Sequence, residues 1–186
     1  VEGKTETVIE DETLNNQVAL WLKSKSEIKP EEYNDFYRHL THDWTDPSKV
    51  IHYKAEGVQE FTSMLFIPSQ RPMNYYYPET KTGLNLYVKR VFIMNDCEDL
   101  LPKYLRFVKG LVDSSDLSLN VSREILQKDR QIAFIRKSLT GKVLKELKDI
   151  QNKEREQYEK FWENFGSATS KGQVKPPKKL VKTLSR

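Results

Sequence analysis

The chain has 186 residues, enough for one domain of ordinary size or two small ones. Hydrophobic residues make up 37% and charged residues 31%, which indicates a globular protein more polar than average. No run of about 18 apolar residues occurs, which excludes a transmembrane helix within this sequence. The single cysteine, Cys97, excludes an internal disulfide, and the first residues lack the apolar core of a signal peptide. We therefore expect a cytoplasmic protein with no membrane partner.

The net charge of +4 is unevenly distributed. Residues 167–186 contain six of the 31 basic residues and no acidic residue, so the rest of the chain has 25 basic and 27 acidic residues and a net charge of −2. We predict a flexible basic tail or linker over 167–186. Such a tail could tether the chain to nucleic acid or to an anionic membrane, but a solvated linker is favoured, and we expect no nucleic-acid partner.

The first half of the chain predicts a helix and then a β-hairpin. Pro30 and the two glutamates after it suit the first turn of a helix, and apolar residues follow at helical spacing, namely Tyr33, Phe36, Tyr37 and Leu40. Residues 50–55 and 61–67 are rich in β-branched and aromatic residues on either side of a turn that contains Gly57. This arrangement is typical of two antiparallel strands.

The second half predicts two further strands and a helical C-terminal part. Residues 84–94 alternate and then become continuously apolar, which indicates one strand entering a core, and residues 104–112 predict another strand. Helical stripes follow over 132–150 and 158–165, with Gly166 as the expected C-terminal stop. The fold class is therefore α+β, resembling an α/β/α sandwich, with a mixed sheet and flanking helices followed by a small helical segment.

Most candidate reactive groups have a simpler structural interpretation. There is no P-loop, no glycine-rich dinucleotide turn and no HExxH motif. His39, His42 and Asp43 lie close together without a second cluster at ligand spacing, so we expect no metal site. Acidic neighbours disfavour the thiolate of Cys97 and argue against a nucleophile. Asp113 is interpreted, with Asp116, as an ordinary turn residue.

Three consecutive tyrosines, Tyr75, Tyr76 and Tyr77, could form a stacking platform for bases or sugars. A platform for single-stranded nucleic acid needs a basic groove beside it, and the sequence outside the tail has no surplus of positive charge. The favoured interpretation is a partly buried loop that packs on the sheet.

Residues 117–127 are the most informative stretch, because they predict a loop that leads into a helix. Ser122 suits an N-cap, and Arg123 and Gln127 are four apart, so that they share one helical face. Such a pair could bind a phosphate or bridge two subdomains. From composition alone, a structural ion pair of Arg123 is the favoured interpretation.

The block Asn-Val-Ser-Arg-Glu-Ile-Leu-Gln over residues 120–127, with residues 107–119 before it, closely resembles the middle domain of the ninety-kilodalton heat-shock chaperones in their bacterial HtpG form. The resemblance extends in order and without large gaps over roughly residues 5–166. It includes segments that match the family's early helix, hairpin and central strand, namely 31–37, 43–47, 60–72 and 86–94.

The resemblance implies an organisation and a function. Residues 1–135 would form the larger α/β subdomain, with a catalytic loop near 113–127, followed by a helical segment over 136–166 and the tail over 167–186. The family's full chain also has an N-terminal nucleotide domain and a C-terminal dimerisation domain. We therefore expect a homodimeric full-length chain and a monomeric fragment, inactive alone, of an ATP-hydrolysing chaperone that assists protein folding.

Site residues are also implied by the resemblance. Arg123 matches the arginine that reaches the γ-phosphate of ATP, which the N-terminal domain holds with Mg. There, a planar and permanently charged donor stabilises the transferred phosphoryl group. Gln127 matches a supporting glutamine of the same loop, and Asn120 matches an asparagine that orders it.

Further matches concern contacts with other domains and proteins. Lys89 and Arg90 match positions that contact the N-terminal domain, although Lys89 stands where the family often has an arginine and lacks its forked geometry. Phe92 matches an apolar position on which the catalytic loop packs, and Trp21 a tryptophan near the client-contacting surface. The expected partners are the nucleotide domain, client proteins and a partner chaperone. The alternative function is a non-catalytic module that binds clients or a partner chaperone.

Overall fold

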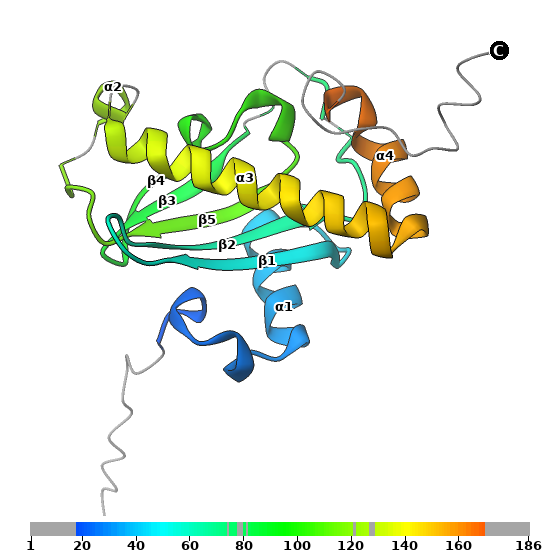
Figure 1. The fold of residues 1–186 in the computed structure, drawn as a ribbon, viewed down its shortest axis with the longest axis horizontal. Helices are drawn as coiled ribbons and strands as arrows, with labels where there is room; N and C mark the ends of the chain where they lie inside the picture. Colours follow the sequence, from blue (N-terminus) through cyan, green and yellow to red (C-terminus); the bar gives the residue numbers. More distant parts are fainter. Residues whose placement is uncertain are drawn as a thin grey trace, which may run out of the picture.

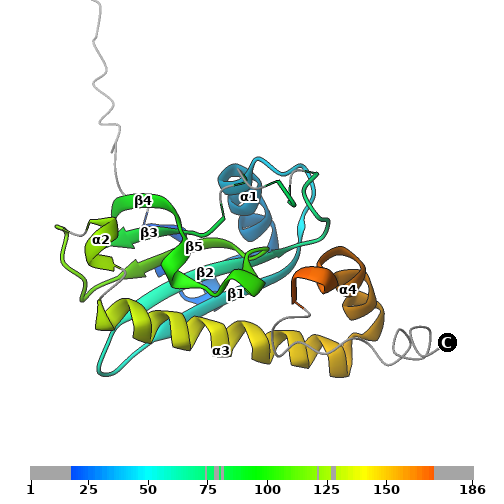
Figure 2. The same cartoon turned by 90° about the horizontal axis from the view of Figure 1, so that it is seen from above.

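The computed structural model shows three layers. A five-stranded sheet carries α1 (Pro30–Thr41) on one face and α3 (Arg130–Lys153) across the other (Figure 1). The short helix α2 (Arg123–Leu126) lies at one end of α3 and α4 (Arg155–Thr169) at the other, as the view from above also shows (Figure 2). The predicted α+β sandwich is confirmed. The structure describes residues 18–73, 75–77, 80, 82–120, 122–126 and 129–169.

The sheet is mixed, as the sequence predicts. Its spatial order is β1-β2-β5-β3-β4, in which β3 and β5 run parallel and the other neighbouring pairs run antiparallel. The first two strands form the expected hairpin. The strands are β1 (Pro47–Ala55), β2 (Phe61–Pro68), β3 (Leu84–Val88), β4 (Val91–Cys97) and β5 (Lys109–Ser114).

The sheet separates two hydrophobic cores, and β2 contributes to both. All eight residues of β2 are buried, which explains why its sequence is almost continuously apolar rather than alternating. Leu65 and Ile67 belong to the larger core, which contains the apolar stripe of α3. Met64 and Phe66 belong to the smaller core, where Tyr37 of α1 is 1% exposed. Both faces of the sheet are therefore covered by helices.

The prediction of a single strand over 84–94 is wrong. The chain forms a tight hairpin there, with Val88 paired to Val91 and the turn made by Lys89 and Arg90. Their φ angles are +50° and +68°, and positive φ at both central residues is the backbone of a type I′ turn. Such turns strongly prefer Asn-Gly or Asp-Gly, so two long basic residues gave no signal for a turn in the sequence.

Two other boundaries also differ from expectation. The strand predicted from residue 104 begins at Lys109, because residues 103–105 form a 3₁₀ turn, and it continues through Asp113. Helix α4 runs past Gly166 to Thr169, so the tail predicted from residue 167 does not begin there, and residues 170–186 lie outside the described part of the chain. Gly166 does not end the helix: a Cβ there would lie 2.7 Å from the ring of Trp162, so the close approach of that ring requires the missing side chain. The expected division at residue 135 falls inside α3, and its role as a subdomain boundary stays a prediction.

Gly110 marks a close contact between the two central strands. It pairs with Leu65 of β2 and has a φ of +137°. A Cβ at this position would overlap the carbonyl oxygen of Met64 and lie 2.9 Å from Leu65 Cα. Glycine usually weakens a strand, but here the close approach of β2 requires it.

Within the described part of the chain, no helix has both the length and the apolar character needed to cross a membrane.

Candidate functional site

The predicted catalytic loop leaves the sheet at the end of β5 and is fixed at both ends. Leu117 at its start and Leu126 in α2 are each 1% exposed and belong to the larger core. The backbone of Arg123 begins α2, and Ser122 precedes it as expected for the N-cap position, with its carbonyl accepting the Leu126 N–H at 3.1 Å. Asn120 lies between the two anchors and is exposed. Gln127 lies outside the described residues.

Hydrogen bonds at the start of the loop restrict it further. The Ser114 hydroxyl accepts the N–H groups of Asp116 and Leu117, both at 3.3 Å. The Asp116 carboxylate accepts the Glu60 N–H at 2.6 Å, and the Ser115 N–H donates to the Glu60 carbonyl at 3.1 Å. The loop is thus attached to the β1–β2 hairpin by backbone-centred contacts, which limit the positions that its exposed middle can sample.

The turn of Lys89 and Arg90 lies directly beside the start of this loop. Strands β3 and β5 are parallel, with Val88 paired to Ser114, so the turn and the loop follow the same end of neighbouring strands. The Lys89 N–H donates to the Ser114 carbonyl at 2.9 Å, which joins the two segments. Both basic residues are exposed. The structure therefore brings the expected interdomain residues next to the expected catalytic loop.

Asp113 connects this turn to the segment around Trp21. One carboxylate oxygen accepts the Arg90 N–H at 3.1 Å, and the other accepts the Trp21 indole N–H at 2.9 Å. The Asp113 side chain is 6% exposed, so both hydrogen bonds hold a buried charge. The interpretation of Asp113 as an ordinary turn residue is wrong, because it lies within β5 and has two partners distant in the sequence.

The ring of Tyr87 lies between those of Trp21 and Phe92 and contacts both. The ring of Tyr87 lies 5.0 Å from the Trp21 ring and 5.4 Å from the Phe92 ring, measured between centroids. Phe92 is 47% exposed, whereas Trp21 is only partly exposed. Burial, and then the charge of Asp113, raise the pKa of Tyr87. We call the set of Trp21, Tyr87, Lys89, Arg90 and Phe92 the docking face.

We expect Asp113→Ala to destabilise the chain by about 2–4 kcal/mol, because two part-buried donors lose their acceptor and each costs about 1–2 kcal/mol, toward the lower end of the range for an unpaired donor. Urea unfolding followed by circular dichroism measures the change. Asp116→Ala is the matched control, since this exposed carboxylate accepts a single backbone N–H. Its expected cost is about 1 kcal/mol. Equal losses from the two substitutions would contradict the role of Asp113 as a buried connection.

The backbone of Trp21 is held separately by His52. His52 Nε2 lies 2.9 Å from the Trp21 carbonyl oxygen, and Nδ1 lies 2.9 Å from the Tyr33 hydroxyl. Since the carbonyl can only accept, Nε2 carries the proton and Nδ1 accepts from the hydroxyl of Tyr33. Burial is the main cause that lowers the pKa of His52, so the neutral ring is favoured in the folded chain.

This arrangement predicts a pH dependence. Because folding lowers the pKa of His52, the unfolded chain binds the proton more tightly than the folded chain. The free energy of unfolding is therefore greatest above the ordinary pKa of histidine and falls as the pH drops below it. One proton contributes at most about 1.4 kcal/mol per pH unit. Unfolding at pH 7.5 and 5.5 should show a smaller acid-induced loss for His52→Gln than for the unmodified chain. Parallel losses would contradict the assignment.

Other candidate groups have structural partners. Tyr37 donates its hydroxyl to the Asp43 carboxylate at 2.8 Å, and Asp43 also accepts the Thr45 N–H at 3.1 Å, which fixes the end of α1. No group of three or more metal-type side chains was found among the residues that the structure describes.

Tyr75 is 3% exposed and belongs to the larger core, in line with the favoured interpretation of the tyrosine loop, whereas Tyr76 is 51% exposed.

Several known proteins are similar to this chain over most of its length. The family model described as Hsp90 protein matches residues 2–181. The chaperone protein HtpG of Bdellovibrio bacteriovorus is 61% identical over 163 residues, which cover 88% of this chain and 26% of that protein. HtpG of Rhodococcus jostii is 53% identical over 171 residues, covering 92% of this chain and 27% of that protein. The chain spans about a quarter of the length of these relatives.

A solved structure is also similar. The middle domain of a Plasmodium falciparum heat shock protein superposes with a TM-score of 0.71 at 27% sequence identity, covering 81% of this chain and 58% of that one. The family model spans nearly the whole chain, and the bacterial relatives are more than half identical to it. The chain therefore belongs to the Hsp90 protein family, and its mixed-sheet sandwich is the fold of a middle domain of that family.

Proposed function

We propose that this chain is the middle-domain part of an HtpG-type, ATP-dependent chaperone, and that Arg123 contacts the γ-phosphate of ATP held by the nucleotide domain. The supporting observation is the two-ended anchoring of the loop that leads into α2, where the backbone of Arg123 begins the helix. A donor delivered from a restrained loop loses little conformational freedom at the moment of reaction. In this proposal the nucleotide domain binds ATP and Mg, and this chain completes the active site.

The other proposed roles follow from position. Asn120 and Gln127 belong to the same loop and help to order it around the nucleotide. The docking face lies beside that loop and offers two exposed cations and an exposed ring, which suits a contact with the nucleotide domain near its bound polyphosphate. Trp21 also contributes to client binding. The full-length protein would be a homodimer through a domain outside this chain.

The experiment that tests this function adds the chain to the separately purified nucleotide domain of the same protein and measures ATP hydrolysis. We expect a saturable rise in rate, because the added chain supplies the missing donor. We expect Lys89→Ala/Arg90→Ala to raise the concentration needed for half-maximal stimulation about tenfold, since exposed charges mainly govern encounter and docking.

Lys145→Ala/Lys148→Ala is the matched control, because it removes two exposed positive charges from α3. It should leave the half-maximal concentration unchanged. If the chain binds the nucleotide domain without accelerating hydrolysis, the catalytic role is wrong, and the non-catalytic binding module becomes the better account.

A further inference from the structure

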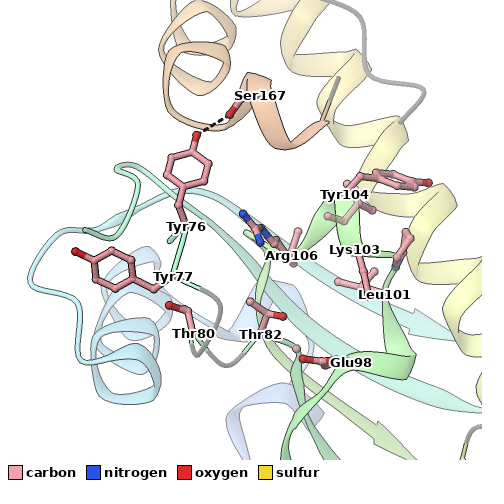
Figure 3. Close-up of a pocket in the computed structure, with 14 residues that line it drawn as sticks. Tyr76, Tyr77, Thr80, Thr82, Glu98, Leu101, Lys103, Tyr104, Arg106 and Ser167 are labelled. Carbon is pink, nitrogen blue, oxygen red and sulfur yellow. Dashed lines mark hydrogen bonds between the residues drawn. The ribbon is translucent and has the colours of Figure 1, made fainter. Parts of the chain in front are cut away.

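A cavity of about 600 Å³ is lined by residues of the segments 76–83 and 98–108 and by the end of α4 (Figure 3). It lies at the opposite end of β3 and β5 from the docking face. Two of its lining residues, Gly83 and Val108, directly precede β3 and β5, whereas the docking turn and the catalytic loop follow those strands. The end of α4 contributes Ser167 to the wall. A volume between about 300 and 1,000 Å³ is typical of ligand sites.

The cavity contains an arginine that aromatic rings hold in place. The guanidinium of Arg106 lies 4.4 Å from the centroid of the Tyr75 ring and 6.0 Å from that of Tyr76. No ion pair of Arg106 with a carboxylate was found among the residues that the structure describes. A guanidinium stacked on rings keeps its N–H edge available for a planar anion. Figure 3 shows Arg106 directed into the space between Tyr76 and Tyr104.

The wall that carries Tyr76 is fixed by several contacts. Its hydroxyl lies 2.6 Å from Ser167 Oγ of α4 and accepts a hydrogen bond from Arg71 at 2.9 Å. The Arg71 guanidinium also lies 4.8 Å from the ring centroid, and its backbone N–H donates to the Asn164 side chain at 3.1 Å. This wall is therefore braced against α4, which favours a preformed site over one that must be assembled on binding.

The remaining lining is mainly apolar with a positive charge excess. Lys103 and Arg106 are the cations and Glu98 is the one carboxylate among the described lining residues, and Glu98 lies toward the lower edge of Figure 3, away from Arg106. Carbon-rich surface comes from Tyr77, which is 63% exposed, and from the segment that follows the 3₁₀ turn at residues 98–100. The apolar lining residues of this segment are Leu101, Pro102, Tyr104, Leu105 and Val108. Leu105 and Val108 are 0% and 1% exposed, so the accessible carbon comes mainly from the half-buried Pro102 and Tyr104.

We propose that this cavity binds a short polypeptide segment in which a carboxylate lies beside an aromatic or large apolar side chain. The carboxylate would accept two N–H groups from Arg106, and the apolar side chain would pack between Tyr77 and the carbon-rich wall. A single planar arginine without a glycine-rich backbone cradle suits a carboxylate better than a polyphosphate. The inference goes beyond the proposed ATP-related role, and its test needs no nucleotide domain.

The test is a titration of the isotope-labelled 186-residue chain, followed by amide chemical shifts. The probe is the acetylated tetrapeptide amide alanine-phenylalanine-aspartate-alanine, compared with its asparagine counterpart. A third peptide places phenylalanine at a free carboxyl terminus and so distinguishes a terminal from a side-chain carboxylate. We expect saturable shifts at Gly83, Val108 and Ser167 with at least one acidic peptide, and at least tenfold weaker binding of the asparagine peptide.

Two substitutions test separately the contact with the carboxylate and the contact with the apolar side chain. Arg106→Gln should weaken binding of the acidic peptide by about 10- to 100-fold, the usual range for loss of a charge-assisted hydrogen bond. It should leave the affinity for the asparagine peptide unchanged. Tyr77→Ala should weaken binding of both peptides. The substitution removes an exposed side chain, so we expect the fold to be retained. Arg136→Gln is the matched control, because this arginine is exposed on α3 and lies outside the cavity lining. Equal affinity for the acidic and neutral peptides, or an unaffected Arg106→Gln variant, would overturn the proposal.

Discussion

Arg123→Ala should remove most of the ATPase stimulation that the chain gives to its nucleotide domain. If Arg123 donates to the γ-phosphate in the transition state, its loss lowers the saturating rate by about 10²–10³, the usual effect of deleting one preorganised donor. The measurement is steady-state hydrolysis at saturating concentrations of the added chain. Binding of the two domains, followed separately by calorimetry, should change little, because the contribution of Arg123 is made in the transition state.

Two further variants test this expectation. Arg123→Lys keeps the charge but not the forked, planar donor set, so we expect a rate between those of the unmodified chain and Arg123→Ala. Arg130→Ala removes an exposed arginine from the first position of α3 and should leave the stimulation unchanged. Equal stimulation by the unmodified chain and Arg123→Ala would refute the proposed contact with the γ-phosphate.

Gly110→Ala should abolish folding or cost more than about 4 kcal/mol of stability. The φ of +137° is unfavourable for any L-residue, and the new Cβ would overlap the carbonyl oxygen of Met64. Both the Met64 carbonyl and Leu65 Cα belong to the backbone of a strand buried on both faces, so no side-chain rotation relieves the overlap. Yield of folded chain and urea unfolding measure the effect.

Two other glycines serve as controls that separate strain from steric overlap. Gly57 has a φ of +125°, yet a Cβ there would meet nothing within 4 Å, so Gly57→Ala should cost only the backbone strain of about 1–3 kcal/mol. Gly141 lies in α3 with open space around it, and Gly141→Ala should stabilise the chain by about 0.5–1 kcal/mol. A loss for Gly110→Ala no larger than that for Gly57→Ala would show that the strand approach is not essential.

The sequence predicts the fold well where one physical signal dominates. The β1–β2 hairpin follows from β-rich runs around Gly57, and α1 follows from Pro30 and its apolar face. The hairpin at Lys89 and Arg90 could not be predicted in this way, because its turn has the backbone of Asn-Gly with the side chains of two basic residues. Its conformation depends on tertiary hydrogen bonds, from the Lys89 N–H to Ser114 and from the Arg90 N–H to Asp113.

The candidate site could likewise be predicted only in part from the sequence. The resemblance on residues 120–127 identifies the loop and Arg123, and the register of β3 on β5 then places Lys89 and Arg90 beside it. Asp113 has no local pattern that distinguishes it from a turn residue, because both of its partners are distant in the sequence and depend on strand order. The cavity around Arg106 is also assembled from three separate segments, so periodicity and motif spacing contain no signal for it.

The hydrogen bond from Trp21 to Asp113 has a spectroscopic consequence. The indole N–H and the Arg90 N–H share one carboxylate, so a displacement of the docking turn changes the field at the indole and with it the emission of Trp21. Trp44 is 94% exposed and Trp162 packs against the larger core, and phenylalanine at both positions would leave a single emitter. The chain thus contains its own optical reporter for a displacement of this turn, with no attached dye.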